Sequence, residues 1–99
     1  MIEKDFGIVY GSFDEVYTDL KSIMSSLYET IQREPEVEDN KQLFKKLGET
    51  SLKLLSAQKR LVNVYGDRYT KDVYISLTDS KKSNMEEVLN QIDSKTKKL

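Results

Sequence analysis

The strongest constraint on the fold is a seven-residue apolar repeat that occurs in two separate stretches of the chain. In the first stretch the repeat runs, in alternating steps of four and three residues, through Phe6, Tyr10, Phe13, Tyr17, Leu20, Met24, Leu27 and Ile31. The second stretch has the same spacing through Leu43, Leu47, Thr50, Leu54, Ala57, Leu61 and Val64. Such steps keep one line of side chains on one face of a helix. The repeat therefore predicts two long helices that pack through these lines.

A short segment with helix-breaking character separates the two stretches. Pro35 restricts the residue before it, and the acids between Glu34 and Asp39 suit the start of a following helix. Gly66 follows the second stretch at the position where a helix C-terminal cap belongs. Two helices of matched length with a short connection form an antiparallel αα-hairpin, which we expect over residues 1–70.

Residues 73–77, Val-Tyr-Ile-Ser-Leu, form the one stretch that resembles a β-strand. We expect a turn at residues 79–82 and then a short C-terminal helix, one face of which is marked by Met85, Val88, Leu89 and Ile92. The expected fold is mainly α: the hairpin, one β-strand and a short terminal helix, the last two within residues 71–99. Because an isolated strand is not stable, Val73–Leu77 is expected to pair with the same strand of neighbouring copies in a ring.

Several apolar side chains lie beside the two repeat lines and need cover from another surface. Such patches mark interfaces. The candidate subunit contacts are Val16, Ile23, Phe44, Leu55, Val62 and Tyr65, together with the strand residues Val73, Tyr74 and Ile75.

The net charge of −1 hides an asymmetry between the two arms of the hairpin. Residues 1–40 hold three basic and ten acidic side chains, whereas residues 41–60 hold six basic ones and one acid. The candidate contacts with DNA phosphates are Lys41, Lys45, Lys46, Lys53, Lys59 and Arg60. The alternative is a solvated face, or ion pairs with Asp14 and Asp19 on a neighbouring acidic arm. We favour the alternative, because an overall acidic chain binds DNA weakly.

The composition argues against catalysis. The chain has neither Cys nor His, so the commonest general base, the commonest metal ligand and the usual nucleophile–His pairs are missing. No Gly-Lys-Ser/Thr phosphate loop is present, and the acids at 34–39 lack the Gly-bearing loop of a calcium site. We therefore expect no enzyme, no cofactor and no metal. No apolar run approaches membrane-spanning length, so we expect a cytosolic protein without membrane contact.

Several short segments occur in an order that has a counterpart in a known family. They are Asp5-Phe6-Gly7-Ile8-Val9, Leu27-Tyr28-Glu29-Thr30, Leu43-Phe44-Lys45-Lys46-Leu47-Gly48, Thr50-Ser51, Lys53-Leu54-Leu55, Val73-Tyr74-Ile75 and Asn84-Met85-Glu86-Glu87-Val88-Leu89. In this order, with the Pro-containing loop after the second segment, they resemble the small terminase subunit of T-even-like tailed bacteriophages. The resemblance covers residues 5 to about 70 and residues 72 to 92.

The resemblance implies a non-catalytic regulator of viral DNA packaging in the host cytoplasm. Such subunits form rings from coiled-coil-like hairpins, bind or help select concatemeric double-stranded DNA, and modulate the large terminase subunit, which carries the ATPase and the nuclease. Two alternatives stay open. One is a small helical-hairpin adaptor or assembly chaperone that binds a protein partner, and the other is a nucleic-acid-binding regulator that acts as a dimer.

Overall fold

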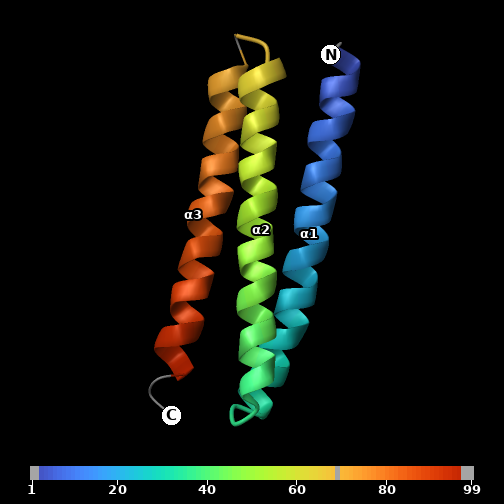
Figure 1. Cartoon of the computed structure of the whole chain (residues 1–99). Helices are drawn as coiled ribbons and strands as arrows, with labels where there is room; N and C mark the ends of the chain where they lie inside the picture. Colours follow the sequence, from blue (N-terminus) through green and yellow to red (C-terminus); the bar gives the residue numbers. More distant parts are fainter. Residues whose placement is uncertain (1–2, 69, 97–99) are drawn as a thin grey trace.

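The chain folds into three long antiparallel helices (Figure 1). The structure is a computed structural model and describes residues 3–68 and 70–96. The helices are α1 (Glu3–Arg33), α2 (Glu38–Tyr65) and α3 (Lys71–Thr96). The molecule measures 50 × 19 × 14 Å, and its radius of gyration is 15.9 Å. A compact domain of this length would have a radius of gyration of about 13 Å, so the bundle is markedly elongated.

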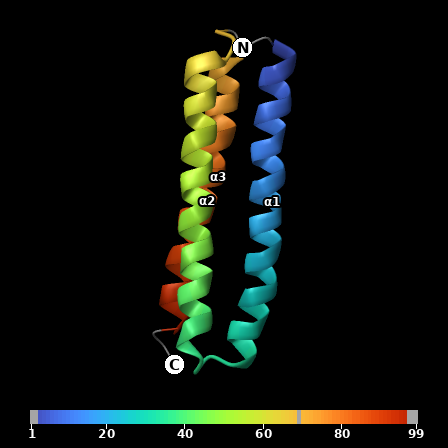
Figure 2. The ribbon, with the colours of Figure 1, turned by 45° about the vertical axis from the view of Figure 1, so that its right-hand side comes forward.

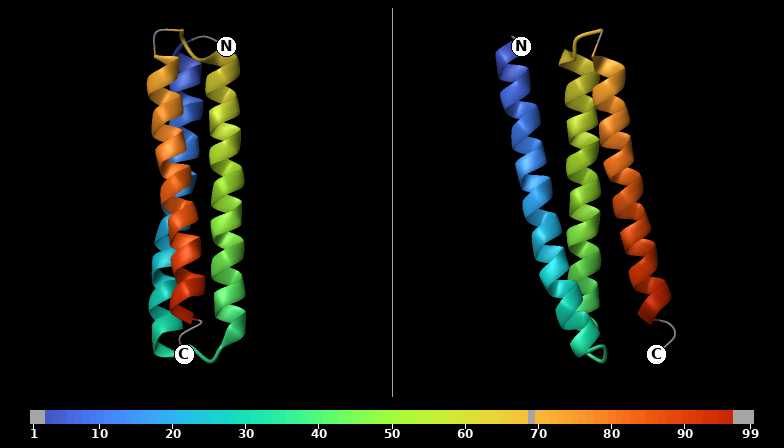
Figure 3. Two further views of the ribbon diagram at one scale, coloured as in Figure 1. Left: turned by 90° about the vertical axis from the view of Figure 1, so that its left-hand side faces the viewer. Right: turned by 180° about the vertical axis from the view of Figure 1, so that it is seen from behind.

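The three helices form a V in cross-section, with α2 at the apex. Figures 1 and 2 show α2 next to α3 and joined to α1 at the lower end, and the side view in Figure 3 places α1 and α3 on the same side of α2. Among the described residues, α2 packs against both other helices, and no Cα atom of α1 lies within 8 Å of one in α3. The space between the arms is therefore spanned by side chains alone.

Helices α1 and α2 form the antiparallel hairpin that the apolar repeat predicts. The core line of α1 also follows the predicted repeat, because its buried residues are Phe6, Tyr10, Tyr17, Met24 and Ile31. Helix α2 ends at Tyr65 as expected, where the Gly66 N–H donates a hydrogen bond of 2.8 Å to the Val62 carbonyl. The connection between the two helices, residues 34–37, contains Pro35.

The buried line of α2 lies one residue further along the chain than the repeat predicts. It consists of Phe44, Gly48, Ser51, Leu55, Gln58 and Val62. The predicted line is at the surface or only half-buried, and Leu43 and Val64 keep 51% and 64% of their surface exposed. The shift arises because α2 must face two partners. Its buried centre lies between the side that meets α1 and the side that meets α3.

The predicted β-strand is wrong. Val73–Leu77 lies at the start of α3, residues 79–82 continue that helix, and the described residues contain no strand. Buried residues of α3 occur at helical steps of seven residues at Thr78, Met85 and Ile92, whereas Val73 is 60% exposed. Packing against α2 therefore overrides the β propensity of the segment. Because these residues are helical, the expected pairing of strands between copies is wrong as well.

Aromatic side chains bridge the gap between α1 and α3 at one end of the bundle. Near the N-terminus of α1, Phe6 and Tyr10 form a small core with Val62 of α2. Tyr74 of α3 reaches across to them, with ring centroids 5.6 Å from Phe6 and 4.8 Å from Tyr10. A larger core, which includes Met24, Leu55 and Met85, fills the middle of the bundle and the end near the hairpin loop.

Candidate functional site

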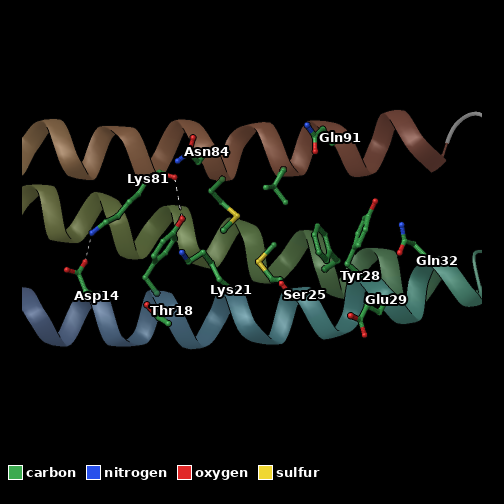
Figure 4. A pocket seen from close by; sticks show the side chains of 15 residues that line it. Asp14, Thr18, Lys21, Ser25, Tyr28, Glu29, Gln32, Lys81, Asn84 and Gln91 are labelled. Carbon is green, nitrogen blue, oxygen red and sulfur yellow. Dashed lines mark hydrogen bonds and ion pairs between the residues drawn. The ribbon is translucent and has the colours of Figure 1, made fainter.

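A groove of about 840 Å³ runs between α1 and α3. Its apolar lining includes Met24 of α1, Phe44 of α2 and Met85 of α3. Figure 4 shows polar side chains of the two outer helices along its walls, among them Lys21 of α1 and Gln91 of α3. A groove with an apolar lining and polar walls is suited to binding an elongated amphipathic partner.

A polar network crosses the groove and joins all three helices. Lys81 of α3 forms an ion pair with Asp14 of α1. Gln58 of α2 donates from Nε2 to Asp14 Oδ1 at 2.8 Å and to the Tyr10 carbonyl at 3.3 Å. The Thr78 hydroxyl lies 3.3 Å from Gln58 Oε1. Because Gln58 and Thr78 are fully buried, these hydrogen bonds fix the spacing of the helices.

Tyr17 lines the groove near the end at which Asp14 and Lys81 pair. Its ring is buried, its hydroxyl donates to the Lys81 carbonyl at 3.5 Å, and Lys21 Nζ lies 4.8 Å from the ring centroid. Desolvation by burial raises the pKa of Tyr17 above the ordinary value of 10.0.

Tyr17→Phe should reduce the loss of stability at high pH. The pKa of Tyr17 is higher in the folded state than in the unfolded state, so its contribution is complete below pH 10 and is lost as the pH rises through the folded pKa. We would measure the free energy of unfolding in urea between about pH 8 and 11. The control is Tyr65→Phe, because Tyr65 is 49% exposed. If the free energy of unfolding falls equally steeply with pH in Tyr17→Phe and in Tyr65→Phe, the expectation is contradicted.

A second surface lies on the side of the hairpin that faces away from α3. Successive residues of a helix are turned by about 100°. On α1, the residue after Tyr17 is Thr18, which lines the groove beside α3. The residue before it, Val16, therefore lies on the opposite side of the core line, as does Ile23 one heptad further. Val16 and Ile23 are 47% and 52% exposed.

Helix α2 continues this surface. The residue after Gln58 is Lys59, whose Nζ lies 2.8 Å from Asp79 Oδ1 of α3. Ala57, the residue before Gln58, is exposed and is turned by about 200° from Lys59 around α2. It also borders a shallow recess that Lys82 of α3 lines. We call the combined apolar surface the back face; its members are Val9, Phe13, Val16, Leu20, Ile23 and Leu27 of α1 and Leu43, Leu47, Thr50, Leu54, Ala57, Leu61 and Val64 of α2.

The two margins of the back face carry opposite charges. On α1 the margin holds the exposed acids Glu15 and Asp19, here called the acidic edge. On α2 the margin holds the exposed bases Lys46, Lys53 and Arg60, here called the basic edge. In the described part of the chain, none of these three bases has an ion-pair partner. Both edges therefore keep their charge available for a partner.

The structure separates the predicted interface residues into two groups. Val16 and Ile23 lie on the back face, and Tyr65 and Val73 are also exposed. Phe44, Leu55 and Val62 are 2% exposed or less, because they fill the core of the chain itself. Tyr74 and Ile75 are half-buried and pack against the small core near the N-terminus of α1. Most members of the back face are therefore residues of the two apolar repeat lines that the sequence predicts, and Val16 and Ile23 lie beside them.

The six predicted phosphate contacts are also separated. Lys59 pairs with Asp79, and Lys41 Nζ lies 3.8 Å from Glu38 Oε2. Lys45 is half-buried. The other three form the basic edge. A shallow recess between α2 and α3 places two of them, Lys53 and Arg60, near Lys82 and the acid Glu86 of α3.

Sequence reasoning missed the groove and its network. The groove needs α3 as its second wall, and the first half of α3 was expected to be a strand and a turn. The spacing of Tyr74, Thr78, Lys81 and Met85, in steps of four, three and four, was the signal that could have revealed this wall.

The described residues contain no group of three or more acidic, His or Cys side chains placed to hold a metal ion. None of the helices, as far as they are described, combines the length and apolar character needed to cross a membrane. Comparison of the chain with known protein families, with curated proteins and with solved structures finds no match.

Proposed function

We propose that the chain is a self-assembling, non-catalytic regulator of viral DNA packaging, of the small terminase type. The observation that carries the proposal is the back face, an apolar surface along both helices of the hairpin on which Val16, Ile23, Leu43 and Val64 keep 47% to 64% of their surface exposed. An apolar surface of this extent on a small bundle is expected of a subunit of a larger assembly. The resemblance of residues 5–70 to small terminase subunits supplies the biological setting, including a ring, the large terminase subunit and viral DNA.

Lys46 and Arg60 of the basic edge are the proposed phosphate contacts. Both are exposed, and Lys82 lies beside Arg60 in the recess between α2 and α3. Attraction of this kind is independent of sequence and weakens as salt concentration rises. The acidic charge of the rest of the chain keeps the contact weak.

The first experiment is to measure absolute mass in solution by light scattering behind size exclusion, at low and high salt. We expect an assembly of many times the 11.5 kDa chain mass. The assembly is then added to the large terminase subunit of the same phage with duplex DNA, and ATP hydrolysis is expected to change. A chain that stays at 11.5 kDa at high protein concentration would exclude the ring.

Ile23→Glu should convert the assembly to smaller species, because a charge in an apolar contact has to be desolvated without a partner. Ile23 is 52% exposed, so the folded monomer tolerates the change. The matched control is Ser22→Glu, since Ser22 directly precedes Ile23 in α1, is exposed and lies outside the back face. Light scattering reads the mass, and circular dichroism checks that helix content is kept. An unchanged mass for Ile23→Glu would remove the back face as the assembly surface.

A second candidate is the adaptor that binds one protein partner, and the groove between α1 and α3 favours it. The groove has apolar lining from all three helices and polar walls, the arrangement that accepts an amphipathic helix. A monomeric chain that does not change ATP hydrolysis by the large terminase subunit would favour this candidate over the first.

A further inference from the structure

We infer that copies of this chain pair through the back face with α1 of one copy lying antiparallel on α2 of the next. The occupant of the back face is thus a second copy of the chain, and the rotation axis of the assembly runs along the helices. This inference deepens the proposed function, since it names the contact by which the subunits would assemble. It does not depend on DNA packaging itself.

The first argument is charge complementarity. Between Asp5 and Ile31, α1 carries five acids and one base, Lys21, and that base lies on the groove side over the Tyr17 ring. The basic edge of α2 lies at the opposite margin of the same back face. A surface with an acidic margin and a basic margin complements its own copy when the copy is turned about an axis parallel to the helices.

The second argument excludes the other simple packing. A two-fold axis in the plane of the back face, perpendicular to the helices, would lay α1 on α1 and α2 on α2. The acidic edges would then face each other, and so would the basic edges. Like charges that face each other across a contact oppose association. Charge therefore selects the axis parallel to the helices.

The third argument is that opposite charges lie at the same height along the bundle. Gln58 bonds to the Tyr10 carbonyl and to Asp14, which fixes the α1 residues beside it. Lys53 is five residues nearer the hairpin loop, a level that corresponds on α1 to residues 15–19. At 1.5 Å per residue, Glu15 and Asp19 lie within about 3 Å of this level along the axis.

A rotation about an axis parallel to the helices keeps every residue at its own level. Lys53 of one copy therefore faces Asp19 and Glu15 of the next. The basic edge extends away from the loop through Arg60, and the acidic edge extends in the same direction from Asp19 to Glu15. A two-fold dimer would bury the whole back face of both copies, whereas around a ring each copy would present its acidic edge to one neighbour and its basic edge to the other. Lys53 faces Asp19 in both arrangements, so this ion pair can be tested before the number of copies is known.

The test is a charge exchange between separate chains. Asp19→Lys and Lys53→Asp are prepared singly, and association is followed by sedimentation of each variant alone and of an equal mixture. Each single variant should associate about tenfold more weakly than the original chain, because an attractive pair becomes repulsive at every contact. The mixture should recover the original affinity, since every contact between the two variants is attractive: half of the contacts join the two exchanged charges, and the other half keep the original pair of Lys53 and Asp19.

The controls carry the same charge changes on other surfaces. Asp72→Lys lies on the exposed side of α3, and Lys21→Asp lies in the groove. Neither should weaken association by a comparable factor. Circular dichroism of all variants checks that the helices are kept.

Three results would overturn the inference. The first is a mixture that associates no better than the single variants, and the second is association that neither variant weakens. The third is that Lys53→Asp weakens retention on duplex DNA while assembly is unchanged, which would assign Lys53 to DNA. Failure of the proposed function would give a different result. In that case the mixture recovers assembly, but ATP hydrolysis by the large terminase subunit does not change.

Discussion

Leu55→Ala should lower the free energy of unfolding by about 3 kcal/mol, because it leaves a cavity in a closely packed core. The Leu55 side chain is 1% exposed. Leu54, the neighbouring residue, is half-buried on the back face, so Leu54→Ala should cost only about 1 kcal/mol. The comparison asks which of two adjacent leucines lies at the centre of the α2 interface.

The measurement is urea unfolding followed by circular dichroism, with both variants made in the Ile23→Glu background. That background keeps the chains apart, so contacts between copies do not add to the cost of Leu54→Ala. A larger cost for Leu54 than for Leu55 would mean that α2 is rotated toward the line that the apolar repeat predicts.

Gly48→Ala should destabilise the bundle by about 1–2 kcal/mol, although alanine is the better helix former. A β-carbon at Gly48 would lie 2.9 Å from Leu89 Cγ of α3, and it would also collide with Cδ2 of the same side chain. The added methyl group must displace Leu89 or push α3 away from α2. The steric cost is therefore expected to exceed the gain of about 1 kcal/mol in helix propensity.

Two companion variants make the cause of the Gly48→Ala effect measurable. At Gly11 no atom lies within 4 Å of an added β-carbon, so Gly11→Ala should stabilise the chain by up to about 1 kcal/mol. Leu89→Ala removes the obstacle, so Gly48→Ala should cost less in that background, or become stabilising. If Gly48→Ala stabilises the original chain as Gly11→Ala does, the close approach of α2 and α3 is not maintained in solution.

The hairpin was predictable because its evidence is repeated many times along the chain. On α1 a single apolar line dominates, and its residues Phe6, Tyr17 and Met24 are buried as the spacing predicts. On α2 two apolar lines lie side by side with the same repeat. The periodicity alone does not distinguish Leu54 from Leu55, because the choice depends on where a third helix packs.

Sequence reasoning did not predict the first half of the third helix. Val73, Ile75 and Leu77 alternate along the chain, which is the spacing of a half-buried strand, whereas the helical spacing of Thr78 and Met85 is spread over a longer range. The prediction followed the local alternation and not the longer helical spacing, so the groove, which needs the third helix as a wall, was not predicted. Val16 and Ile23 belong to the predicted hairpin, and both are exposed beside the core line of α1, as their place outside the repeat indicates.

The order of packing along the chain has a consequence for how quickly the molecule forms. Within the described residues, the close backbone contacts join helices that are neighbours in sequence, α1 with α2 and α2 with α3, whereas α1 and α3 meet only through side chains. Contacts between consecutive helices close short loops and lose little chain entropy, so a bundle of this topology has a low contact order and is expected to fold within about a millisecond. Since α2 belongs to both pairs, the rate should respond most strongly to substitutions in that middle helix.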